Sequence, residues 1–180
     1  MTPDEFAEKW GDDPDFLAPF PLGLLNQFPL RFADKHFLFE AGLPSGAAPC
    51  LSFGPKYASY FATDTGMQIG SNGSGDPIVL SSNGDIHYLN HDSSLAVHYV
   101  NRDLESLAEA LLQYRHLINE TCHELGPDAF LDGLVPLRLR DSWVRFLQSV
   151  DPVALQSGSL WAEEAAMWVA HDDPRLTQGL

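Results

Sequence analysis

The strongest constraint on the fold is a hairpin signature in the middle of the chain. Two apolar runs, residues 77–81 and 85–89, are separated by Ser82, Asn83 and Gly84. Asn-Gly between two such runs favours a tight hairpin, because both residues tolerate the positive φ angles of a type I′ turn. A glycine-rich stretch, residues 70–75, precedes the first run and predicts another turn. The segment therefore predicts an antiparallel meander.

The other expected elements follow from hydrophobic periodicity, caps and helix breakers. Strands grouped before helices are typical of the α+β class, with an antiparallel sheet of four to six strands. We expect one domain over residues 1–180, in which the Pro-rich arm packs on the rest. In chain order the elements are a helix from the capping box of Thr2 and Glu5, the Pro-rich arm at about 11–31, a helix at 33–41, and strands at 50–53, 56–62, 67–70 and 95–100. The helical part, at about 101–172, holds a helix that starts at Asn101 or Asp103 and ends at 125, and helices at 137–150 and 159–170.

Composition favours a soluble cytoplasmic protein. The chain has 180 residues, 44% of them hydrophobic, and no apolar run approaches the length of a membrane span. The N-terminal residues lack the basic and apolar regions of a secretory signal. Cys50 and Cys122 match no zinc or redox spacing, so we interpret them as buried free thiols in a reducing compartment.

The net charge of −15 is shared by both halves of the chain rather than collected in a tail. Nucleic-acid binding needs clustered Lys and Arg, so we expect no nucleic-acid partner, and an acidic membrane surface is disfavoured for the same reason. A basic protein would be attracted and steered. The alternative is that the charge serves only solubility.

No motif of catalysis, metal binding or cofactor binding is complete. His87 and His91 belong to a strand and to the loop after it, and with Asp92 they do not make the three or four convergent ligands that zinc needs. The glycine-rich stretch leads into a strand, whereas phosphate-binding loops lead into a helix. No serine elbow is present, and both cysteines lie in apolar segments. We therefore expect no catalytic residue, no metal and no cofactor.

Four short segments follow one another in a characteristic order along the chain: Phe37 to Pro44, Ile69-Gly70 with Pro77 to Ile86, Val100-Asn101 with Leu104 to Leu107, and Asp151-Pro152 with Trp161. Together they resemble the SUKH superfamily, in its bacterial immunity-protein branch rather than the branch of the yeast cell-wall synthesis regulator. The resemblance spans roughly residues 30–170 and depends on the order and spacing of the segments. Ser81 and Leu107 replace an aspartate and an aromatic residue that are common in the family, and the Pro-rich arm has no counterpart.

This resemblance implies a curved antiparallel sheet backed by helices and a non-enzymatic protein that neutralises a cognate, often nucleic-acid-directed, bacterial toxin by direct binding. Two alternatives stay open, a regulatory interaction scaffold and an enzyme of unrecognised class. We expect a monomer or weak dimer that binds a basic toxin domain or another protein through loops at the ends of the sheet. The candidate partner-binding residues are Asp64, Asp76, Asp85, Asp92, Ser71, Asn72 and Gly73.

Overall fold

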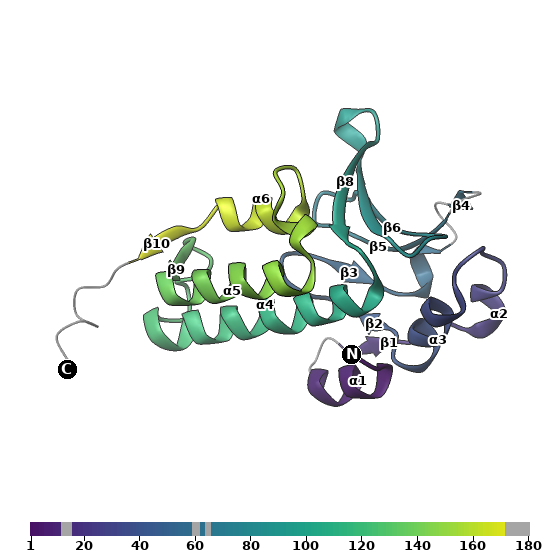
Figure 1. Ribbon diagram of the computed structural model, residues 1–180, viewed down its shortest axis with the longest axis horizontal. Coiled ribbons are helices and arrows are strands. Elements are labelled where there is room, and N and C mark those ends of the chain that lie inside the picture. The colour runs from purple at the N-terminus through teal and green to yellow at the C-terminus, as the bar shows by residue number, and fades with distance from the viewer. Residues whose placement is uncertain (12–15, 59–61, 64–65, 172–180) are drawn as a thin grey trace.

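The computed structural model describes residues 1–11, 16–58, 62–63 and 66–171 (Figure 1). Its centre is an antiparallel sheet with the strand order β3-β5-β6-β7-β8, and β4 also pairs with β5. The predicted α+β class and antiparallel sheet are confirmed. The strands are β3 (Ser52–Phe53), β4 (Ala62–Thr63), β5 (Gly66–Ser71), β6 (Pro77–Ser81), β7 (Ile86–Asn90) and β8 (Ala96–Asn101).

Helices flank this sheet on two sides. Figure 1 shows α4 and α5 running side by side away from the sheet, while α1 lies below the start of α4 and α2 and α3 lie below the sheet. None of the helices in the described ranges is long and apolar enough to cross a membrane. The remaining elements are α1 (Pro3–Trp10), β1 (Leu17–Ala18), α2 (Leu22–Leu25), α3 (Phe32–Glu40), β2 (Leu43–Pro44), η1 (Pro55–Tyr57), η2 (His91–Ser93), α4 (Leu104–Leu125), β9 (Leu134–Pro136), α5 (Leu137–Val150), η3 (Pro152–Leu155), α6 (Leu160–Ala166) and β10 (Val169–His171).

The predicted hairpin forms, but through a different turn. β6 and β7 pair antiparallel with Leu80 opposite Ile86, and the bond from the Ser81 N–H to the Asp85 carbonyl closes the hairpin, so residues 82–84 make the loop. Gly84 has φ +99°, whereas Asn83 is not among the residues with positive φ, so the type I′ prediction was wrong. The backbone N–H of Gly84 donates to Ser81, and the N–H of Ser81 donates to Asp85. This is the three-residue alternative, a turn followed by one left-handed glycine.

Two other predictions fail where chain breakers or distant pairing decide the structure. The strand expected at 56–62 is replaced at its start by η1, because Pro55 follows Gly54 and favours a tight helical turn. The helix expected at 159–170 ends at Ala166, and β10 then pairs parallel with β9. Neither of these two short strands was predicted, since each exists only by pairing with a segment far along the chain.

The N-terminal segments pack on the domain as expected. Thr2 caps α1, and Glu5 returns the hydrogen bond of a capping box. In the Pro-rich arm Phe20 and Leu25 are fully buried, so the described part of the arm belongs to the core. A further part of that core is a cluster of aromatic rings around the buried Tyr114 on α4. Its other members are Phe130, Trp143, Trp161 and Trp168, and the three tryptophans are core residues as predicted.

A buried polar network joins the sheet to the C-terminal elements. The carboxylate of Asp151 is 1% exposed and accepts from the Tyr99 hydroxyl (3.0 Å), the Asn101 amide (3.2 Å) and the backbone N–H of Arg102 (2.9 Å). Asn101 in turn accepts from the Trp161 indole N–H at 3.0 Å. Burial raises the pKa of Tyr99, and the charge of Asp151 adds to that shift, so the hydroxyl stays a donor. Three residues of the four sequence segments, Asn101, Asp151 and Trp161, thus meet at one point.

Replacing Gly84 with alanine should destabilise the protein by about 2 kcal/mol in urea unfolding, since a side chain at positive φ costs about 1 kcal/mol or more. The added Cβ would also overlap the guanidinium of Arg31, which is held by Asp34 through two bonds of 2.7 Å. Gly75→Ala is the matched control, because φ is +87° and a Cβ there meets no atom within 4 Å. It should cost only the backbone part, about 1 kcal/mol. Equal losses would show that the Arg31 contact is unimportant.

Removing the acceptor of the buried network should be more damaging. Asp151→Ala should lower the free energy of unfolding by about 3 kcal/mol, because buried donors of Tyr99 and Asn101 lose their partner. Asp141→Ala on the exposed face of α5 should change it by less than about 0.5 kcal/mol. A loss below about 1 kcal/mol for Asp151→Ala would mean that the packing of α6, not this carboxylate, attaches the C-terminal elements.

Candidate partner-binding site at the tip of the β7–β8 hairpin

The predicted partner-binding residues divide between the two ends of the sheet. The β5–β6 loop, residues 72–76, and the β7–β8 connection, residues 91–95, leave the sheet at the same end. The β6–β7 turn leaves it at the opposite end, and Asp85 lies there, 3.8 Å from His87. Asp64 lies outside the described residues. A single surface through all four predicted acids is therefore not formed, and the rest of this section concerns the end that bears Asp92.

The glycine-rich loop is folded tightly around Asn72. The Oδ1 atom of Asn72 accepts from the backbone N–H groups of Ser74 (3.0 Å) and Asp76 (2.9 Å). Its Nδ2 group donates to Asp76 Oδ2 at 2.9 Å, and the hydroxyl of Ser71 donates to the carbonyl of Asn72. Gly73 is exposed at the surface of the loop. Internal hydrogen bonds therefore occupy Asn72 and fix the loop in one shape.

Asp76 joins this loop to the β7–β8 connection. It is only 3% exposed, and its Oδ1 atom accepts from both the backbone N–H (2.9 Å) and Nδ1 (2.6 Å) of His91. Burial alone would raise the pKa of Asp76, but hydrogen bonds from His91 and Asn72 outweigh it and hold the pKa below its usual value. Asp76 is thus a buried internal acceptor rather than a displayed acid, and its role in partner binding stays a prediction.

The β7–β8 connection is the displayed part of this end. Asn90 Oδ1 accepts from the N–H groups of Asp92 (3.0 Å) and Ser93 (3.1 Å), which shapes η2. The side chain of Asp92 is 83% exposed, and its Oδ1 lies 3.3 Å from His91 Nε2. Asp92 is therefore the predicted acid that can meet a partner directly.

The residues after η2 add an apolar surface that was not predicted. Leu95 is 45% exposed and Val97 is 65% exposed, and both belong to the hairpin that projects from the sheet in Figure 1. Ser94 and Leu95 have φ angles of +55° and +61°, a conformation that costs non-glycine residues roughly 1–2 kcal/mol each. The run Leu95-Ala96-Val97 in the sequence was the available signal, but strand periodicity gave no indication of exposure.

β8 is also an edge strand, and only its second half is covered. His98 Nδ1 lies 3.1 Å from the Gly158 carbonyl, and Tyr99 reaches Asp151, so the C-terminal elements cover β8 from His98 onward. Ala96 and Val97 precede this cover and are exposed. Unpaired edges can accept an additional strand. We define the hairpin tip as Asp92, Leu95, Ala96 and Val97.

The other sequence candidates do not assemble into a reactive centre among the described residues. No group of three or more His, Cys, Asp or Glu side chains there could hold a metal ion. His87 packs edge-on against Tyr99, and its buried Nδ1 has no described hydrogen-bond partner. Both cysteines are free thiols, but Cys50 is exposed and Cys122 is partly exposed, so the expectation of buried thiols was wrong. Cys50 lies in a turn with φ +57°, which turns its side chain out of the apolar run.

No family model matches the chain, and neither a curated protein nor a solved structure matches it.

The role of Asp76 can be tested by pH. Asp76→Asn should lower the free energy of unfolding by about 1–2 kcal/mol at pH 7. Because the pKa of Asp76 is lower in the folded protein, its contribution is present above the unfolded value, about 3.9, and is lost as pH falls through the folded value. The difference between the variant and the parent should therefore shrink below about pH 4. Asp92→Asn, at the same end of the sheet but exposed, should change stability by less than about 0.5 kcal/mol. If the stability difference between Asp76→Asn and the parent stayed constant down to about pH 2, the ionised Asp76 carboxylate would not be what holds His91.

Proposed function

We propose that this chain is a non-enzymatic protein-binding domain that takes a basic protein partner on the hairpin tip. The observation that carries the proposal is the exposed apolar edge at Leu95 and Val97, which lies beside the exposed carboxylate of Asp92. Apolar contacts supply affinity, and a neighbouring charge supplies selection and speed of association. The net charge of −15 sets the sign of the partner.

The rigidity of the tip supports binding rather than a mobile connection. Asn72, Asp76 and His91 tie the two neighbouring loops together, so the tip is held in place before a partner arrives. Such preorganisation lowers the entropy cost of association. The left-handed Ser94 and Leu95 support the same interpretation, since strained backbone persists mainly where it has a use.

The partner that we propose is a bacterial toxin domain of the same cell, which this protein neutralises by occupying it. This step depends on the resemblance to the SUKH immunity proteins and on the acidic charge, because toxins directed at nucleic acids are commonly basic. The discriminating experiment is co-expression with the product of the adjacent gene. Rescue of growth by a stoichiometric complex supports an immunity protein, whereas a complex with a protein that is not toxic favours the regulatory scaffold.

The absence of catalysis remains a separate prediction. His87, His91 and Cys50 are the side chains with the strongest claim to reactivity, and His91 already uses Nδ1 on Asp76. Saturable turnover that a single substitution at one of these positions abolishes would refute a purely binding role.

Charge and apolar contact at the tip should affect different rate constants. Asp92→Lys should slow association with the toxin domain roughly fivefold and weaken its salt dependence, because steering acts on the encounter. Leu95→Ala combined with Val97→Ala should instead raise the dissociation rate roughly tenfold, since short-range contacts hold the complex. Both are measured by stopped flow at ionic strengths from about 50 to about 500 mM, which brackets physiological screening.

The control acid must be exposed and distant from the tip. Asp132, in the loop between α4 and β9, meets both conditions. Glu163 and Glu164 on α6 are unsuitable as control acids. Each accepts a hydrogen bond of 2.9 Å, Glu163 from the Tyr88 hydroxyl and Glu164 from the Tyr114 hydroxyl, so a lysine at either position would also disturb the attachment of α6. Equal slowing by Asp132→Lys and Asp92→Lys would mean that only the total charge matters, and unchanged dissociation of the double alanine variant would exclude the tip.

A further inference from the structure

A second surface feature lies away from the tip, where α1, α3 and the start of α4 meet. A pocket of about 460 Å³ opens there between the first residues of α1, the outer face of α3 and Glu105 of α4. This volume is in the range of ordinary ligand sites. α1 and α3 pack through Phe6 and Phe37, whose ring centres are 5.7 Å apart. This contact holds together the two helices whose residues line the pocket.

One wall of the pocket is an aromatic ring with an unusual degree of exposure. Phe32, the first residue of α3, is 84% exposed. His36 lies one turn later and stacks on it, with ring centres 6.2 Å apart and planes at 28°. Phe37 also lines the pocket and is itself only 4% exposed. The exposed ring of Phe32 therefore stands at the rim of the pocket together with His36, where a ligand can reach it.

Carboxylates flank these rings. Glu5 accepts a hydrogen bond from the backbone N–H of Thr2 at 2.7 Å, and this bond lowers the pKa of Glu5, so the group is ionised at neutral pH. Glu105 lies across the pocket with its side chain 64% exposed, and its Oε2 atom is 3.4 Å from the ammonium group of Met1. Glu105 therefore already pairs with one ammonium group in this position.

We propose that this pocket binds the side chain of an arginine or lysine of a protein partner, with the cation over the face of Phe32 and its charge opposite Glu5 and Glu105. The alkyl stem of such a side chain fits apolar walls, and aromatic faces attract cations within about 6 Å. The Met1 ammonium group already lies near Glu105, so the preference for a cation depends mainly on Glu5: an apolar ligand would cover the Glu5 carboxylate without compensation, and an anion would be repelled by it.

That the occupant belongs to a basic protein depends on the function proposed above, whereas the existence of the site does not. The pocket lies on α1, α3 and α4, and no residue of it belongs to the hairpin tip. A small probe can therefore test the pocket alone, and its failure would leave binding at the tip unaffected.

The probe is N-acetyl-arginine-N-methylamide, which presents the side chain as a protein does, and the readout is the NMR shift of the Phe32 and His36 ring protons. We expect a saturable shift with a millimolar dissociation constant. The citrulline analogue has the same shape without the charge and should bind at least fivefold more weakly, as should free arginine, whose own carboxylate would face Glu5 and Glu105. Phe32→Ala and Glu105→Gln should each weaken binding of the arginine probe at least fivefold.

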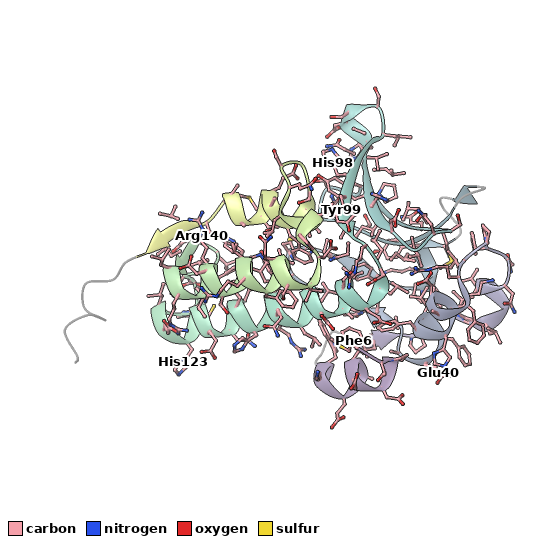
Figure 2. The ribbon with its side chains drawn as sticks, in the orientation of Figure 1. Phe6, Glu40, His98, Tyr99, His123 and Arg140 are labelled. Atoms are coloured by element: carbon pink, nitrogen blue, oxygen red, sulfur yellow. The ribbon has the colours of Figure 1, made fainter. Side chains whose placement is uncertain are left out.

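Two matched variants serve as controls. Leu131→Ala removes another side chain that is 84% exposed but lies in the loop between α4 and β9. Glu40→Gln removes the carboxylate at the end of α3, labelled in Figure 2, which is not among the residues that line the pocket. Neither should change the affinity by more than a factor of two. Equal binding of the citrulline analogue, an equal loss with Glu40→Gln, or no saturable shift would each overturn the proposal. Tighter binding of free arginine than of the blocked probe would assign the pocket to a free metabolite and would overturn the protein occupant.

Discussion

The buried carboxylate of Asp151 is the contact on which the arrangement of the molecule depends. This carboxylate accepts hydrogen bonds from Tyr99 and Asn101 on β8, the last strand of the sheet. Asp151 is also the residue from which the C-terminal turn η3 begins. A buried acceptor with three donors is costly to misplace, so it favours one docking of the C-terminal elements against the sheet. That docking covers β8 from His98 onward. Ala96 and Val97, at the start of β8, lie beyond the C-terminal elements and stay exposed.

Local chemistry predicted the elements well wherever neighbouring residues decide the structure. α5 has the bounds expected from its apolar spacing and from the break at Asp151-Pro152, and Thr2 caps α1 as expected. Of the two expected starts of the long helix, Asn101 and Asp103, the structure has Asp103 as the cap of α4. The hairpin was recognised through Gly84, whose positive φ the turn requires. Its turn type was not, because a third loop residue changes which positions must be left-handed. The pair of β9 and β10 could not be predicted, since its two short strands have no pattern of their own.

The candidate site was predictable in part. In a meander, alternate connections leave the sheet at the same end, so the grouping of residues 72–76 with 91–95 follows from the strand assignment alone. The separation of Asp85 from Asp92 follows in the same way. The burial of Asp76 does not, because its partner His91 is 15 positions away and a sequence gives no measure of which acid turns inward. An acidic residue in a loop is therefore weak evidence for a displayed charge.

The two left-handed residues at the tip have a consequence for how such a chain can change. Glycine at position 94 or 95 would relieve the backbone and make the isolated protein more stable, but glycine at 95 would also delete an exposed leucine. Under the proposed function, stability and partner binding would therefore favour different residues at the same position. A lineage that kept the fold and had no use for this surface would be free to drift toward glycine at position 95, so a leucine retained there across relatives would point to a surface that is used.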